Sequence, residues 1–256
     1  DGKTYYIPTV SNLVDENIHW EVVTGFDFGI ESQVFNSKLT LEAGYYTKST
    51  NDLLAYVAPP VSVGAGFAIT NAGSLKNSGV EFMLTWRDKI GKFNYSASIN
   101  GATLKNEVLA LGNDNSDIVT GSYHRTSVGH PVGAIYGYVQ DGVFQNQNEI
   151  NNYYPTSWIS KPGDIRYKDL DGDQKITAAD RDFIGSTIPT FTYGANLYAS
   201  YQDFDLSIDF NGAYGNEIIN TKKLPTYAQF NYYTTSLNRW HGEGTTNEFT
   251  SSEGYR

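Results

Sequence analysis

The stretch that decides the fold is TFTYGANLYASYQDFDLSIDFNGAY, residues 190–214. Hydrophobic residues alternate with small or polar ones from Phe191 to Tyr201, and again from Phe204 to Phe210. Successive side chains of a β-strand point to opposite faces, so each run is predicted to be a strand with one hydrophobic and one polar face. Almost nothing separates the two runs, which predicts a β-hairpin.

The hydrophobic face of this hairpin needs a cover, and two kinds of cover are possible. A second sheet would cover it in a water-soluble sandwich, and lipid would cover it in a membrane barrel. Each run is about 10 residues long, which is the length needed to cross a bilayer at a tilt. Aromatic residues gather near the ends of the runs, where the aromatic girdle of a membrane barrel lies. They are Phe191, Tyr193, Tyr198, Tyr201 and Phe204.

Composition restricts the class of protein. The 256 residues suit one or two domains, and no stretch approaches 18 apolar residues, so helical membrane spans are excluded while a barrel is not. With 20 tyrosines and 25 glycines, the chain favours strands and turns. A net charge of -10 argues against a nucleic-acid partner. No cysteine is present, which excludes disulfides and thiolate metal sites.

Catalytic patterns are missing from the sequence. The four histidines lie far apart, and no nucleophile-elbow, zinc-protease or phosphate-loop motif occurs. We therefore expect no enzyme and no catalytic residue. The first ten residues carry no signal peptide, and both ends resemble loops, so we expect a piece of a longer protein.

The alternation of the opening stretch recurs in two earlier pairs of runs. We therefore expect six strands, near residues 20–32, 38–56, 78–88, 92–105, 190–201 and 204–214. Long loops are expected near residues 57–76, 106–189 and 215–256. Within the second loop, glycines and aromatic residues predict a small hairpin from Val132 to Phe144.

Link length separates the two ends of these strands. The links within the three hairpins are tight, and the connections between hairpins are long. Because antiparallel strands reverse direction each time, all tight links fall at one end and all long connections at the other. Outer-membrane barrels show this asymmetry, with short periplasmic turns and long outer loops, whereas a sandwich has no reason to show it. The prediction is an all-β, antiparallel transmembrane barrel. Asn196, Asp205, Asp209 and Asn211 would then line its wet interior.

One acidic stretch, residues 169–180, matches a calcium-binding loop in spacing. Oxygen ligands would come from alternate positions of the loop and from its last residue. The candidate ligands are Asp169, Asp171, Asp173, the Lys175 carbonyl, Thr177 and Asp180. Gln174 stands where such loops need glycine. The alternative is an acidic surface turn capped by a short helix, so Ca²⁺ is the one cofactor that the sequence suggests.

Several pieces of the chain, in order, resemble the SusC/RagA-like TonB-dependent outer-membrane transporters of Bacteroidota. The resembling pieces are residues 16–21 (ENIHWE), 77–82 (NSGVEF), 129–133 (GHPVG), 136–145 (YGYVQDGVFQ), 162–173 (PGDIRYKDLDGD) and 189–194 (PTFTYG). Gln174 departs from the family, which shows glycine there.

The resemblance implies that residues 1–256 are a C-terminal portion of a plugged barrel of roughly 22 strands with long extracellular loops. The plug domain and the signal peptide would lie outside this chain. The family implies location in the bacterial outer membrane, a SusD-like lipoprotein as lid, and glycan or peptide ligands. It also implies energy from the TonB complex, acting through the missing N-terminal part. It transfers no catalytic or ligand-binding residue.

Two other functions remain open on the sequence. A SusC-like barrel could be a structural subunit of a larger outer-membrane assembly. The chain could also be a secreted, calcium-stabilised β-sandwich that binds glycans. The sandwich would bury its hydrophobic faces, and its tight links need not share one end.

Overall fold

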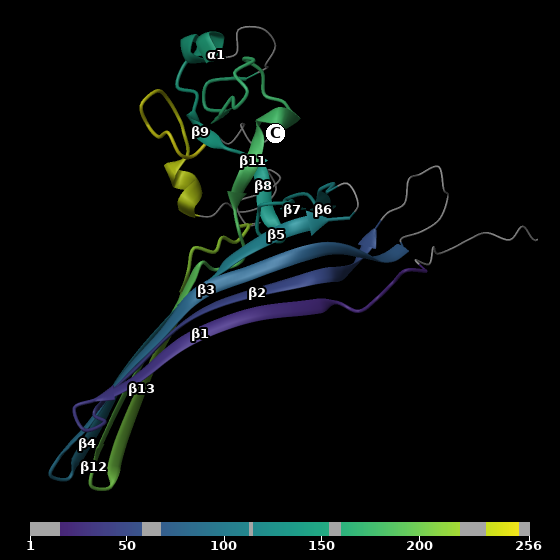
Figure 1. Ribbon diagram of the computed structural model, residues 1–256. Coiled ribbons are helices and arrows are strands. Elements are labelled where there is room, and N and C mark those ends of the chain that lie inside the picture. The colour runs from purple at the N-terminus through teal and green to yellow at the C-terminus, as the bar shows by residue number, and fades with distance from the viewer. Residues whose placement is uncertain (1–15, 58–67, 113–114, 154–159, 221–233, 251–256) are drawn as a thin grey trace, which may run out of the picture. The chain divides into compact units, whose positions relative to one another are not determined.

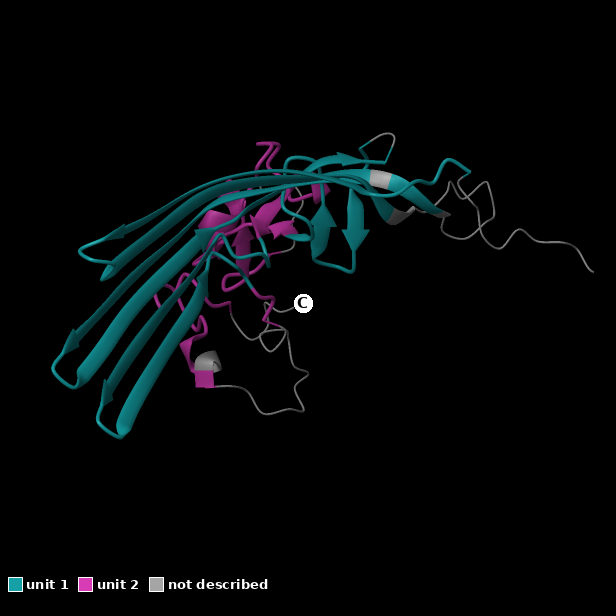
Figure 2. Cartoon of the chain, turned by 60° about the horizontal axis from the view of Figure 1, so that its bottom comes forward, with its two compact units in different colours: residues 1–134, 186–217 teal, residues 135–185, 218–256 magenta. Residues whose placement is uncertain are grey.

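The computed structural model describes residues 16–57, 68–112, 115–153, 160–220 and 234–250. The chain divides into two compact units (Figure 2). Unit 1 comprises residues 1–134 and 186–217, and unit 2 comprises residues 135–185 and 218–256.

Unit 1 is built on one antiparallel sheet of seven strands (Figure 1). Its strands are β1 (Val22–Val34), β2 (Leu39–Val57), β3 (Ala68–Ile90), β4 (Phe93–Thr103), β5 (Lys105–Leu111), β12 (Phe191–Tyr201) and β13 (Phe204–Tyr214). Six of them follow the order β1-β2-β3-β4-β12-β13, and β5 pairs with β3. Among the described residues the sheet does not close on itself, since β1 and β13 form its edges there. A short hairpin of β6 (Ile118–Thr120) and β7 (His124–Thr126) also belongs to unit 1.

The register of β12 and β13 confirms the predicted hairpin and its two faces. Tyr201 pairs with Phe204 and Leu197 with Ile208, so residues of the two hydrophobic runs lie opposite one another on one face. The same face continues across β4, where Ala195 of β12 pairs with Ile99.

The hydrophobic face of the sheet is exposed to the surroundings. Phe28 is 58% exposed, Phe210 59% and Phe204 81%. A soluble sandwich would bury such side chains between two sheets, so these exposures contradict the sandwich alternative. Lipid is the remaining cover for a hydrophobic face of this size.

The three tight turns lie at the same end of the sheet, as Figures 1 and 2 show. They join β1 to β2, β3 to β4 and β12 to β13. Gly91 has a φ of 61° and Gln202 a φ of 54°, backbone values that tight reversals between strands require. The predicted asymmetry of link lengths is therefore confirmed.

The predicted loop near residues 57–76 is wrong in its second half, because β3 begins at Ala68. Residues 68–78 are rich in glycine, asparagine and serine, which favour turns in isolation. They extend as a strand because β2 pairs with one edge, and β5 pairs with the other edge from Gly73 to Ser78. The predicted fourth strand, near 92–105, stops at Thr103, and β5 starts after Leu104.

Unit 2 has a small buried core. Its elements are β8 (Ala134–Tyr138), β9 (Gln140–Val143), α1 (Gln147–Tyr153), β10 (Ile165–Tyr167), the 3₁₀ helix η2 (Ala178–Asp180), β11 (Arg181–Gly185) and the 3₁₀ helix η4 (Thr234–Asn238). Phe144, Ile150 and Ile176 are buried together, with Tyr138 and Tyr167 packed against them. Residues 106–189, expected as one long loop, thus contain several strands and a helix.

The predicted hairpin from Val132 to Phe144 is wrong. Strands β8 and β9 lie within this stretch, but β8 pairs with β11 and β9 pairs with β10. Only Val139 separates β8 from β9, which is too short a link for a hairpin. Each strand therefore finds a partner further along the chain.

Parts of the expected loops lie outside the described residues, namely residues 58–67, 113–114, 154–159, 221–233 and 251–256, as do residues 1–15. Among the described residues, no helix has the length and hydrophobicity needed to span a bilayer.

Candidate functional site

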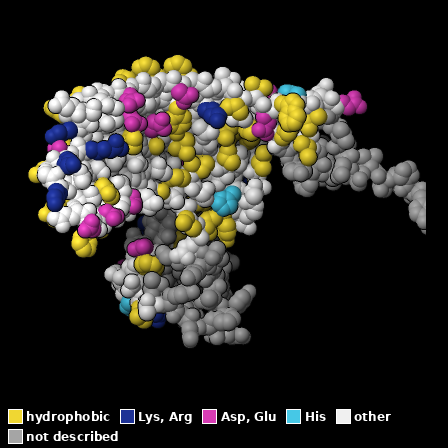
Figure 3. Space-filling view, turned by 90° about the horizontal axis from the view of Figure 1, so that it is seen from below, with side chains coloured by type: hydrophobic (Ala, Val, Ile, Leu, Met, Phe, Trp, Pro, Cys, Tyr) yellow, Lys and Arg dark blue, Asp and Glu magenta, His cyan; other side chains and the backbone are white. Residues whose placement is uncertain are grey.

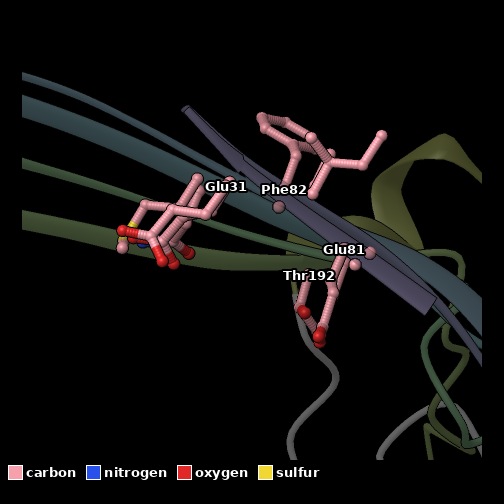
Figure 4. Close-up of a pocket in the computed structure, with 13 residues that line it drawn as sticks. Glu31, Glu81, Phe82 and Thr192 are labelled. Atoms are coloured by element: carbon pink, nitrogen blue, oxygen red, sulfur yellow. The ribbon is translucent and has the colours of Figure 1, made fainter. Parts of the chain in front are cut away.

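A shallow groove of about 570 Å³ lies on the polar face of the unit 1 sheet. Glu31 of β1 pairs directly with Glu42 of β2, and Glu81 of β3 pairs with Gly44 two residues further along β2. Figure 4 shows Glu31, Glu81 and Thr192 pointing to one side of the sheet and Phe82 to the other. The alternation of strand side chains thus brings three carboxylates from three neighbouring strands to one hollow.

Small residues give the groove its depth. Gly29 of β1 and Gly44 of β2 pair with each other and place no side chain in the hollow. The Glu81 side chain lies over Gly44, because a Cβ atom there would be 3.4 Å from both Cγ and Oε1 of Glu81. Gly29 leaves room for a ligand group to approach the backbone of the wall, whereas the Glu81 side chain occupies the space over Gly44.

A second hollow of about 380 Å³ continues the polar face across β12 and β13. Both hollows are lined by Asn100 and Thr192. In the second, Asn196 Nδ2 donates a hydrogen bond of 2.6 Å to Asp209 Oδ1, and Asn211 lies beside them on the wall. Three of the four predicted interior residues therefore line one hollow. The fourth, Asp205, pairs with Ser200 nearer the tight turn.

The distribution of charge on this sheet is visible in Figure 3. Lysine and arginine side chains gather toward the end at which the tight turns lie in Figure 1, and hydrophobic side chains are more frequent toward the other end. Glu31 and Glu81 are exposed and Glu42 is half-buried. Exposed carboxylates, amides and hydroxyls can hydrogen-bond a polar ligand and attract positive charge.

Sequence reasoning assigned only β12 and β13 residues to the interior and missed the glutamates of the groove. The alternation of β1, β2 and β3 carried the signal, since Glu31, Glu42 and Glu81 all fall opposite the hydrophobic positions. The pairing of the strands, which brings the three together, could not be derived from alternation alone.

The acidic loop of unit 2 brings three of its predicted ligands together. Carboxylate oxygens of Asp169, Asp171 and Asp173 lie within 4.8 Å of one another. The Asp169 carboxylate accepts hydrogen bonds from the N–H groups of Gly172 (2.7 Å) and Gln174 (2.8 Å). Gln174 has a φ of 62°, so the glutamine takes the backbone conformation for which glycine is usual.

Neighbouring carboxylates influence one another in this loop. The N–H of Asp173 lowers the pKa of the Asp171 carboxyl and is the largest single influence on it. Desolvation and the negative charges of the other aspartates outweigh it together, so the pKa of Asp171 is raised. A divalent cation would remove this repulsion.

Two of the remaining predicted ligands, Asp180 and Thr177, are engaged in hydrogen bonds within the loop. Asp180 is fully buried, and its carboxylate accepts hydrogen bonds from the N–H groups of Leu170 (2.9 Å) and Thr177 (2.7 Å). The Thr177 N–H, as the largest influence, lowers the pKa of Asp180. Thr177 Oγ1 accepts from Ala179 N–H and completes a capping box of η2, while Lys175 N–H donates to Asp173. The oxygen donors suit Ca²⁺ in kind, and calcium binding stays a prediction.

Comparison with known proteins agrees with this geometry. Residues 2–240 match the family model described as TonB dependent receptor-like, beta-barrel. TonB-dependent receptor P3 of Formosa agariphila is 33% identical over 221 residues, which cover 82% of this chain and 22% of that protein. TonB-dependent receptor SusC of Bacteroides thetaiotaomicron is 27% identical over 227 residues, covering 85% of this chain and 22% of that protein. The chain thus spans about a quarter of the length of these relatives.

Solved structures show the same fold. The structure of the RagAB peptide transporter aligns with a TM-score of 0.73 at 24% identity, over 91% of this chain and 26% of that one. The family match over nearly the whole chain, together with an exposed hydrophobic sheet face and tight turns at one end, leads to one conclusion. The chain belongs to the TonB dependent receptor-like β-barrel family of the bacterial outer membrane.

Proposed function

We propose that this chain forms part of the barrel wall of an outer-membrane importer. Its hydrophobic face lies against lipid, and its polar face lines the interior through which ligand passes. The observation that carries the proposal is the division of one sheet into two faces. Phe28, Phe210 and their neighbours are exposed on one face, and the glutamate groove lies on the other. Outer-membrane barrels divide their strands in this way.

The two ends of the sheet predict how the proposed wall is oriented across the outer membrane. Tight turns in such barrels face the periplasm, so the β1–β2, β3–β4 and β12–β13 turns would lie there. The connection from β4 to β12 leaves and returns at the other end of the sheet. It would therefore lie outside the cell, where ligand first arrives.

The ligand and partners proposed next are based on the relatives, and they concern the full-length protein of which this chain is a part. We propose glycan or peptide ligands, captured together with a SusD-like lipoprotein and moved with energy from the TonB complex. Support comes from the match to the receptor named SusC and from the fold shared with the RagAB peptide transporter. Nothing in these relatives is named as an enzyme, which agrees with a binding and transport role.

Cysteine labelling of the full-length protein tests the wall. Phe210 and Asn211 are neighbours on β13 that point to opposite faces, and this chain contains no cysteine of its own. A fluorophore on Phe210→Cys should be quenched by lipid-soluble quenchers, and one on Asn211→Cys by water-soluble quenchers. Equal access of water-soluble quenchers to both positions would contradict the membrane wall.

Uptake assays test the importer. Cells that carry the full-length protein should take up a labelled oligosaccharide or peptide mixture, and cells without it should not. The variant with Glu31, Glu42 and Glu81 all changed to glutamine should alter the rate for charged ligands while the barrel still assembles. Unchanged uptake after deletion, with other assembly proteins copurifying, would instead favour a structural subunit.

A further inference from the structure

The segment just before β1 is fastened to the ends of β2 and β3 that lie away from the tight turns. The side-chain amide of Asn71 in β3 accepts a hydrogen bond from His19 N–H and donates one to the His19 carbonyl, both at 2.9 Å. The same amide donates to the carbonyl of Asp52 at 2.7 Å. Asp52 lies in β2 with a φ of 58°, where the register with β3 shifts. Three chain segments therefore meet at His19.

Both nitrogens of the His19 ring face acceptors. Nδ1 lies 2.9 Å from the carbonyl oxygen of Asn17, and Nε2 lies 3.3 Å from Oδ2 of Asp52. A neutral imidazole has one N–H and one lone pair, so it would leave a lone pair against one of these oxygens. The protonated ring donates at both positions, and its positive charge also attracts the Asp52 carboxylate.

We propose that His19, Asp52 and Asn71 form a pH-sensitive clip that holds the start of β1 to the neighbouring strands. Histidine titrates near pH 6.5 in the absence of partners. Since the contacts favour the protonated ring, the clip is closed below that pH. It loses the contact with Asp52 as the pH rises through and above that range, and the bonds of Asn71 to the His19 backbone then hold alone.

Among the described residues, the strands β2 and β3 face the ring. Asp52 faces it from β2, and β3 contributes the uncharged Asn71. On the segment itself, Glu21 Oε1 accepts a hydrogen bond from Leu54 N–H at 3.0 Å, and Glu16 is exposed. The Glu21 contact does not depend on His19, so the segment is loosened at its first residues while β1 stays paired.

The solvent exposure of the His19 and Asp52 side chains sets the expected size of the change in the clip's opening equilibrium. The His19 and Asp52 side chains are 56% and 42% exposed, and solvent-exposed ion pairs change an equilibrium by about two- to fivefold. The clip goes beyond the proposed importer role, because it concerns the folded wall whether or not ligand is carried. Trp20 follows His19 and is 89% exposed, so a probe at that position reports on the clip without disturbing packing.

Spin labelling tests the clip in the full-length protein in lipid vesicles, with Trp20→Cys as its single cysteine. The mobile fraction of the label is measured by electron paramagnetic resonance from pH 5 to pH 8.5. We expect it to rise about two- to fivefold, with its midpoint in the histidine range. His19→Gln should abolish the pH dependence, and Asp52→Asn should weaken it.

A matched control is His241→Gln. His241 is exposed, and its Nδ1 contacts the Arg239 carbonyl oxygen. This variant should keep the pH curve of the parent. A parent curve that is flat, or one that persists in His19→Gln, would overturn the clip. Neither result depends on uptake, so the clip and the importer proposal can fail separately.

Discussion

The sheet of unit 1 and the small core of unit 2 treat hydrophobic side chains in opposite ways. In the sheet, Phe204 is 81% exposed and Tyr214 72% exposed. In unit 2, Phe144 and Val143 are fully buried and Ile150 is 3% exposed. Both regions contain antiparallel strand pairs, so strand pairing by itself does not explain the difference.

The difference lies in the solvent of each region. Unit 2 buries its hydrophobic side chains inside the protein, which is the way a domain is stabilised in water. The sheet leaves them on one face, where lipid replaces a second protein layer. Hydrophobic side chains are thus covered by protein in unit 2 and by lipid on the sheet. Substitutions should therefore affect the stability of the two regions by different mechanisms.

The largest expected effect is in the core of unit 2. Phe144→Ala removes a buried ring that packs against Tyr153 and Ile150, and such changes cost about 3–5 kcal/mol. Hydrogen exchange of peptides covering residues 140–153 in the full-length protein should become much faster. Phe210→Ala in β13 should leave exchange in these peptides unchanged. Equal effects of the two variants would show that the regions are not distinct.

A charge on the hydrophobic face of the sheet should have the next largest effect. Ile208 lies near the middle of β13, opposite Leu197, where an arginine would enter the hydrocarbon layer. Ile208→Arg should destabilise the barrel by about 2–4 kcal/mol, measured by urea unfolding in lipid vesicles. The control Asn211→Arg places the same charge on the polar face and should change the free energy of unfolding by no more than about 0.5 kcal/mol, as surface substitutions usually do. Equal costs would contradict the assignment of faces.

The next prediction concerns Asp180 of unit 2, whose buried carboxylate holds a turn through hydrogen bonds. Asp180→Asn keeps one oxygen, so either Leu170 or Thr177 loses its hydrogen bond to a charged acceptor, at a cost of about 1.5–3 kcal/mol. Hydrogen exchange at both amides measures the loss. The exposed Asp182→Asn serves as the control and should have little effect.

The same carboxylate gives the turn a pH dependence with a definite sign. The pKa of Asp180 is lowered in the folded state, chiefly by the Thr177 N–H. Its contribution is therefore complete above the pKa of an unfolded aspartate, about 3.9. The contribution is lost as the pH falls below that value, through the folded pKa. In Asp180→Asn, the acid sensitivity of this turn should disappear.

The smallest expected effect concerns calcium at Asp169, Asp171 and Asp173. A site with a dissociation constant of about 1 mM would gain about 1 kcal/mol at about 5 mM Ca²⁺. Slower exchange of residues 169–180 on adding Ca²⁺ measures it. The effect should vanish in Asp171→Asn with Asp173→Asn and should be absent with K⁺. No Ca²⁺ dependence in the parent would leave this loop as a hydrogen-bonded turn.

The alternation of hydrophobic and polar residues predicted the strands correctly where one face of a strand meets lipid or solvent throughout its length. The pairs of strands around 35–38, 91–92 and 202–203 follow from it, since a hydrophobic residue at every second position fixes the face. It failed from Ala68 to Lys76, because glycine, asparagine and serine carry no face preference. Pairing with β2, and from Gly73 also with β5, holds that stretch extended. It failed again at β8 and β9, whose partners lie 22 or more residues away in β11 and β10.

The sequence by itself determined the two-faced strands, the uneven link lengths and the spacing of the acidic loop, because each is a local property of neighbouring residues. Only the tertiary structure decided which strands pair beyond these three hairpins, and therefore which side chains of different hairpins meet. Glu31, Glu42 and Glu81 share a groove, and His19 meets Asp52 and Asn71, through pairings between residues far apart in the chain. Register between strands is set by the whole sheet at once, so no single segment contains that information.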